Sequence, residues 1–263
     1  MSARRKHPPP LRFEPAVAAV LPGGAHAQRM AFVDVLRGTA IVLMFAYHFS
    51  YDLNFFGAID VDFNHSPLWL GFRTLIVTSF LGLVGVSLIL AHGRRVASRA
   101  LWARVARIVA CAAAVSLASR IVFPNSMIFF GILHFIAVAS VLGVVCVGLA
   151  GWLLPAGILA VVVGTTLSGA WFDQPWLQWF GLMTHKPVTE DYVPFLPWFG
   201  VVLIGMYIGR LLPRLRAWTA LSQWTPQGGA VRTLAFAGRH SLPIYMLHQP
   251  IFLALLYLFF RVV

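Results

Sequence analysis

The sequence has few charged residues. Only 11% of its 263 residues are Asp, Glu, Lys or Arg, whereas about 25% is usual for a soluble domain. Hydrophobic residues make up 59% of the chain, and the mean hydropathy is +0.80. This composition excludes an ordinary soluble domain and predicts an integral membrane protein.

Cysteine is also scarce. Cys111 and Cys146 both fall in apolar runs, where we expect them to be small packing residues. The sequence has no disulfide framework and no metal-ligand spacing, so we expect no metal. The N-terminal stretch MSARRKHPPPLRFEP has no apolar core, unlike a cleavable signal peptide. We predict that residues 1–29 are a disordered, basic cytoplasmic tail.

Long apolar runs are abundant, and each is close to the roughly 20 residues that a helix needs to cross a membrane. They are continuous rather than alternating, which favours helices over a β-barrel. The predicted fold class is all-α, a polytopic transmembrane helix bundle with a cytoplasmic N-terminus, forming a single domain over residues 30–263. About seven spans are expected, at 31–57, 68–91, 101–122, 127–149, 152–171, 192–212 and 241–262. An eighth crossing is allowed if 172–185 re-enters the membrane, and 213–237 is predicted to be a flexible connector.

The net charge of +12 is a topology signal. Sixteen of the 20 Lys and Arg residues lie in three places, namely the segment up to Arg37, 94–107 and 210–239. With seven spans these places share one side of the membrane, which the positive-inside rule makes cytoplasmic. The charge therefore does not indicate a nucleic-acid partner. Acidic residues lie on the opposite side, at Asp60, Asp62, Asp173, Glu190 and Asp191.

Three histidines lie inside predicted spans, namely His48, His134 and His248. A polar side chain at hydrocarbon depth is costly, so each needs a partner or a cavity and is a functional candidate. At 1.5 Å per residue, the three fall in the middle and outer layers of the bundle. We therefore expect them to share one site, and the alternative is that a neighbouring carbonyl or hydroxyl satisfies each of them separately.

The stretch DVLRGTAIVLMFAYHFSYD places ten uncharged residues between Arg37 and His48. This interval is close to three helical turns, so both side chains lie on one face, about 16 Å apart. Arginine suits phosphate, and histidine can accept a proton from an attacking nucleophile. Acyl-coenzyme A has phosphates at one end and a thioester at the other, so its shape suits both residues. Asp52, four residues beyond His48, is within reach to orient its ring.

These charges also allow a purely structural interpretation. Asp34 and Arg37, three residues apart, would form a surface ion pair that anchors the end of the helix. Asp52 would then simply be exposed at the outer membrane boundary. The residues alone leave both interpretations open.

Four segments carry a resemblance over about residues 29 to 255. They are RMAFVDVLRGTAIVLMFAYHFSYDLNFFG, FGILHFIAV, DYVPFLPWFGVVLIGMYIG and GRHSLPIYMLHQPI. Together they resemble the bacterial membrane proteins grouped with the catalytic domain of heparan-alpha-glucosaminide N-acetyltransferase. The interval between Arg37 and His48 is also similar to the motif of membrane acyltransferase family three, which acylates sugars outside the cytoplasm.

The resemblance implies a multi-pass enzyme of the bacterial inner membrane. It would move an acetyl or short acyl group from cytoplasmic acetyl-CoA or another acyl-CoA to a saccharide or glycolipid acceptor at the outer face. The eukaryotic enzyme has Asn at the position matching His48, and its essential histidine lies in the first luminal loop, where His65 in FNHSPLW is the nearest match. His48 is our first candidate and His65 our second, acting as a general base or as a nucleophile that forms an acyl-imidazole.

The expected site residues follow from the spacing and the resemblance together. They are His48, Asp52 and His65 for catalysis, Arg37, Arg239, His134 and His248 for acyl-CoA, and Glu190, Asp191 and Trp198 for the acceptor. Two other functions stay open, namely a proton-coupled transporter or flippase and a non-catalytic scaffold with polar residues between its helices. Membrane lipid is an expected partner, and assembly into a homo-oligomer is left open.

Overall fold

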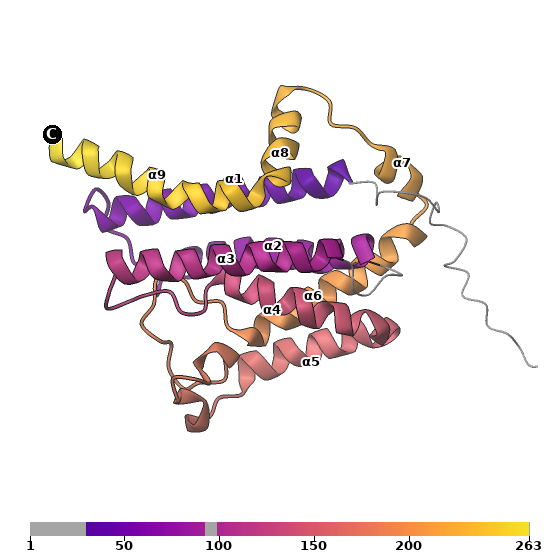
Figure 1. Ribbon diagram of the computed structural model, residues 1–263, viewed down its shortest axis with the longest axis horizontal. Helices are drawn as coiled ribbons and strands as arrows, with labels where there is room; N and C mark the ends of the chain where they lie inside the picture. Colours follow the sequence, from indigo (N-terminus) through magenta and orange to yellow (C-terminus); the bar gives the residue numbers. More distant parts are fainter. Residues whose placement is uncertain (1–29, 93–98, 263) are drawn as a thin grey trace, which may run out of the picture.

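The structure is a computed structural model that describes residues 30–92 and 99–262 (Figure 1). The predicted tail 1–29 lies outside the described residues. Within them the chain is helical, and its only β-pairing is an isolated bridge between Phe130 and Tyr192. The predicted polytopic helix bundle is therefore confirmed. Helices satisfy their backbone hydrogen bonds internally, as a membrane span requires.

Nine α-helices follow one another along the described chain. They are α1 (Ala31–Phe55), α2 (Pro67–His92), α3 (Arg99–Val122), α4 (Ile132–Cys146), α5 (Leu153–Thr166), α6 (Phe195–Leu211), α7 (Trp218–Gln223), α8 (Gly229–Arg239) and α9 (Ser241–Val262).

Six stretches among the described residues are long and apolar enough to cross a membrane. One of them, Ile132–Thr166, contains both α4 and α5. A 3-10 helix, Val147–Trp152, joins the two, and its Ala150 has a non-helical backbone. Figure 1 shows the chain reversing direction at this point, as expected for the separate predicted spans 127–149 and 152–171. By contrast, 172–185 contains only short 3-10 turns, which are too short to span the membrane.

The two ends of the bundle differ in composition. Figure 1 places the start of α1, the end of α2, the start of α3 and the end of α6 together, and we call this the basic end. The loops 56–66, 123–131 and 167–194 lie at the other end, which we call the acidic end. The positive-inside rule predicts that the basic end faces the cytoplasm.

The largest core cluster lies among α2, α4 and α6. Leu88, Phe135 and Met206, one from each helix, are fully buried there. Helices α3 and α9 lie at the periphery, since only 22% and 11% of their apolar windows are buried inside the protein. Lipid is the natural neighbour of their remaining apolar surface.

The prediction of a flexible connector at 213–237 is partly wrong, because this segment contains α7 and most of α8. Helix α8 is amphipathic and buries Ala235 and Gly238. It packs closely on α1, where Gly38 lies against the backbone of Leu234 and Gly238 against the backbone of Asp34. Small residues allow such close approach of two helices. Packing against α1 therefore stabilises α8, although the Gly and Pro residues of this segment had predicted a flexible connector.

We expect Gly238→Ala to destabilise the protein by about 1–3 kcal/mol, because overpacking forces a backbone shift. A Cβ atom at this position would lie 2.7 Å from the carbonyl carbon of Asp34. Gly71→Ala in α2 is the matched control, since its Cβ would meet nothing within 4 Å. Chemical denaturation in detergent measures both changes. Equal stability of the two variants would contradict the close packing of α8 on α1.

Candidate functional site

Two histidines from opposite ends of the sequence lie next to each other in the membrane-spanning part of the bundle. The rings of His48 on α1 and His248 on α9 are 5.0 Å apart between centroids and meet at 67°. Phe45 stacks on His248 at 5.6 Å, and Phe252 meets its ring edge-on at 6.0 Å. The aromatic side chains thus enclose His248, which is only 5% exposed, whereas His48 is partly exposed.

The protonation of His248 follows from its surroundings. Its Nδ1 lies 2.5 Å from the carbonyl oxygen of Tyr245, and a carbonyl can only accept a hydrogen bond. Nδ1 therefore carries the proton, which leaves a lone pair on Nε2. Within the described residues, Nε2 is buried and has no hydrogen-bond partner. A neutral imidazole with this tautomer can accept a proton at Nε2.

Asp52 lies four residues after His48 but has a different partner from the expected one. Its Oδ1 accepts a hydrogen bond from Nε2 of Gln249 at 2.6 Å, and this bond joins α1 to α9. The residue is 1% exposed, so it is not a surface residue at the membrane boundary. Asp52 therefore does not orient the ring of His48 as predicted. It bonds Gln249, which follows His248 in the sequence.

His134 has one partner at the start of α4 and one on α3. Its Nδ1 accepts a hydrogen bond from the backbone N–H of Gly131 at 3.3 Å. Its Nε2 lies 3.1 Å from Oγ of Ser116, which itself donates to the carbonyl of Ile128. Both ring nitrogens therefore have hydrogen-bond partners in the structure. This matches the alternative from the sequence, in which neighbouring groups satisfy each histidine separately.

Arg37 lies at the basic end and joins three helices. It forms an ion pair with Asp34 at 3.0 Å, donates to Oγ of Ser87 in α2 at 2.9 Å, and contacts the carbonyl of Gly238 in α8 at 3.4 Å. Asp34 is only 4% exposed while Arg37 is partly exposed, so the ion pair is partly buried rather than at the surface. Arg239 follows Gly238 directly and is exposed. Two arginines thus lie near this end of α1.

The predicted acceptor residues divide between the acidic end and the core. Glu190 accepts hydrogen bonds from Ser126 at 2.5 Å and from Tyr51 at 3.3 Å. Asp191 accepts one from the backbone N–H of Ile132 at 2.8 Å. Withdrawal from solvent raises the pKa of Asp191, although this N–H acts in the opposite direction. Trp198, by contrast, packs against the main core cluster.

Arg73 is a candidate that our sequence reasoning missed. It is the only Lys, Arg, Asp or Glu in α2, and its guanidinium interacts with the hydroxyl of Tyr47, the neighbour of His48. It also lies near Asp191, which hydrogen-bonds the hydroxyl of Tyr245. Arg73 therefore connects the histidine pair to the acidic end. A single arginine in an otherwise apolar helix was the available signal.

His65 lies apart from the histidine pair in the structure, on the loop between α1 and α2. Its side chain is 85% exposed, and its Nδ1 is 2.9 Å from Oδ2 of Asp62. The backbone N–H groups of His65 and Asn64 also donate to Asp62, and these bonds lower the pKa of its carboxyl. The result is a histidine oriented by a carboxylate, which is a suitable arrangement for a general base.

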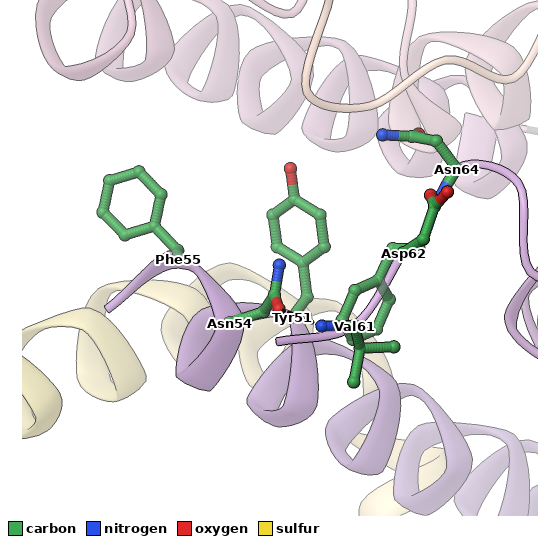
Figure 2. A pocket seen from close by; sticks show the side chains of 7 residues that line it. Tyr51, Asn54, Phe55, Val61, Asp62 and Asn64 are labelled. Atoms are coloured by element: carbon green, nitrogen blue, oxygen red, sulfur yellow. Dashed lines mark hydrogen bonds between the residues drawn. The ribbon is translucent and has the colours of Figure 1, made fainter. Parts of the chain in front are cut away.

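A pocket of about 200 Å³ lies beside this loop and is lined by Tyr51, Asn54, Phe55, Val61, Asp62, Phe63 and Asn64. Figure 2 shows Tyr51 and Asn54 projecting from the last turns of α1, opposite Asp62 and Asn64 on the loop. Because Tyr51 also contacts Glu190, the pocket adjoins the predicted acceptor residues. No cluster of three or more metal-ligating side chains is found in the described part of the chain.

Comparison with known proteins gives one match. A search of curated proteins and a search of solved structures each find none. The sequence profile described as heparan-alpha-glucosaminide N-acetyltransferase, catalytic, matches residues 29–250. This range contains both members of the histidine pair and Arg37. The chain therefore belongs to the heparan-alpha-glucosaminide N-acetyltransferase catalytic-domain family, and it is a multi-pass membrane protein of an acetyltransferase family.

Proposed function

We propose that the protein transfers an acetyl or other short acyl group across a bacterial inner membrane. The donor is cytoplasmic acyl-CoA, and the acceptor is a saccharide or glycolipid at the outer face. The observation that carries this proposal is the contact between the rings of His48 and His248 on the membrane-spanning helices α1 and α9. Family membership supports the acyl-transfer chemistry.

The positions of the charged groups support the direction of transfer. Arg37 and Arg239 lie at the basic end, where the phosphates of acyl-CoA would remain in water. His48 is eleven residues from Arg37, a rise of about 16 Å, which an extended pantetheine arm has the shape to follow. Glu190 and Asp191 belong to the opposite end, where a polar acceptor would approach. Only the small acyl end then has to pass between the two sides.

Reconstitution into liposomes tests both the chemistry and its sidedness. Radiolabelled acetyl-CoA is supplied outside, and glucosamine is trapped inside as the acceptor probe. We expect labelled acetyl-glucosamine inside, because the chain presents donor and acceptor sites on opposite faces. His240→Ala is the control for histidine loss, since within residues 30–92 and 99–262 the side chain of this exposed residue bonds only locally, to the carbonyl of Phe236.

Three outcomes would contradict the proposal. The acyltransferase function fails if wild-type protein turns over no short acyl-CoA. Unmodified glucosamine crossing the liposome membrane through the protein would favour a transporter. In a parallel assay with glucosamine supplied outside as well, transfer only to the outside glucosamine would show that the reaction does not cross the membrane.

A further inference from the structure

Three buried atoms around the histidine pair lack a hydrogen-bond partner among the described residues. They are Oδ2 of Asp52, Nε2 of His248 and Oε1 of Gln249. The residues belong to one cluster, since Gln249 bonds Asp52 and is adjacent to His248. Buried polar groups in proteins are nearly always hydrogen-bonded, so each exception needs an explanation.

All three atoms are hydrogen-bond acceptors. The amide nitrogen of Gln249 donates to the carboxylate of Asp52, so its unpaired atom is the carbonyl oxygen. Nδ1 of His248 carries the proton that meets the carbonyl of Tyr245, so Nε2 offers a lone pair. The second carboxylate oxygen of Asp52 is likewise an acceptor. The unpaired atoms of the cluster are therefore an excess of acceptors, which need hydrogen-bond donors.

This excess limits which chemical group can bind there. A phosphate, a carboxylate or a thioester carbonyl brings further acceptors and would leave the three atoms unpaired. An amine or a sugar hydroxyl brings donors, and an amine brings at least two. Leaving a buried acceptor unpaired costs about 1–3 kcal/mol, so the cluster selects a ligand that donates hydrogen bonds.

We propose that Asp52, Gln249 and His248 bind the nucleophilic amine or hydroxyl of the acceptor. This assignment rests on the proposed acyltransferase function and gives His248 a different role from the acyl-CoA contact predicted for it. The nucleophile attacks the thioester carbonyl, a C–N or C–O bond forms, and the C–S bond breaks. The proton of the nucleophile passes to Nε2 of His248 and then to the sulfur of the departing coenzyme A. Asp52 and Gln249 position the nucleophile for this attack.

Acceptor selectivity tests the assignment. Steady-state kinetics with acetyl-CoA compare glucosamine with glucose, which offers hydroxyls but no amine. For Asp52→Asn and Gln249→Ala we expect the KM for glucosamine to rise about 10- to 100-fold, as loss of a hydrogen bond to a charged or buried group predicts. The KM for acetyl-CoA should stay within about twofold. The preference for glucosamine over glucose should fall at least tenfold in Asp52→Asn.

Ser140→Ala is the matched control, because Ser140 Oγ is also buried without a partner in the described part of the chain but lies on α4, outside the cluster. Thermal unfolding and acetyl-CoA binding show that each variant is folded. An unchanged selectivity, or equal changes in the KM values for acetyl-CoA and glucosamine, would overturn the assignment. This result is distinguishable from failure of the proposed function, in which the wild-type protein itself has no turnover.

Discussion

Alanine at His248 or at His48 is expected to lower the rate of acyl transfer by about 10²- to 10⁴-fold, the usual contribution of a general acid or base. His248 has the larger expected effect, because its Nε2 lone pair is oriented by the bond from Nδ1 to Tyr245. His48 packs against this ring at 5.0 Å. Its loss would alter both the position of His248 and the access of the thioester.

The measurement is kcat for acetyl transfer to glucosamine by purified protein in detergent. His240→Ala should keep the wild-type kcat, which shows that loss of a histidine is not harmful in itself. A single-turnover experiment separates the two possible chemistries. A nucleophilic histidine would retain the acetyl label when no acceptor is present, whereas a general base would not.

His65 is the alternative catalyst, and its substitution tests this. Its ring is oriented by Asp62 on the outer loop, in an exposed Asp–His pair. If kcat is lost in His65→Ala but retained in His48→Ala and His248→Ala, the loop histidine is the catalyst. The pair of His48 and His248 would then be structural, and the assignment of His248 as the proton acceptor would also be wrong.

Arg37→Ala is expected to destabilise the protein by about 3–5 kcal/mol, the cost of leaving the buried carboxylate of Asp34 without its partner. Asp34 is 4% exposed and would keep a charge without its partner. The bond from Arg37 to Ser87 in α2 would also be lost. Denaturation in detergent measures the change. Arg239→Ala is the control and should change stability by less than about 0.5 kcal/mol, because this side chain is exposed.

A second substitution separates the structural role of Arg37 from binding of acyl-CoA. Asp34→Asn in the Arg37→Ala background removes the unpaired charge and should restore a large part of the lost stability. If this double variant is stable and its KM for acetyl-CoA equals that of the wild type, then Arg37 only holds helices together. An increase of about tenfold or more in this KM would support the predicted contact with phosphate.

Several features of the site follow from local sequence alone. Arg37 and His48 share a face of α1 because eleven residues make close to three helical turns. Asp34 lies one turn before Arg37, so the predicted ion pair forms. The helix predicted at 241–262 is α9. Such features depend on periodicity and hydropathy within a short stretch, which a single sequence displays directly.

Other features depend on which helices become neighbours. The sequence predicted that Asp52 orients the ring of His48, four residues away. In the structure the hydrogen-bond partner of Asp52 is Gln249, nearly two hundred positions along the chain. The sequence also grouped His134 with the other histidines, but the two nitrogens of this ring bond Gly131 at the start of α4 and Ser116 on α3. Proximity in sequence favours a contact, and packing between helices decides whether that contact forms.

The sequence by itself determined that this protein is a membrane helix bundle of an acetyltransferase family, because apolar runs of this length have few other stable folds and the motifs of the family lie within them. Only the tertiary structure decided that His248 meets His48, that Asp52 pairs with Gln249 and that Arg73 reaches Tyr47. The physical reason is that these contacts join different helices. Their formation depends on the side-chain packing of the whole bundle, which no local pattern encodes.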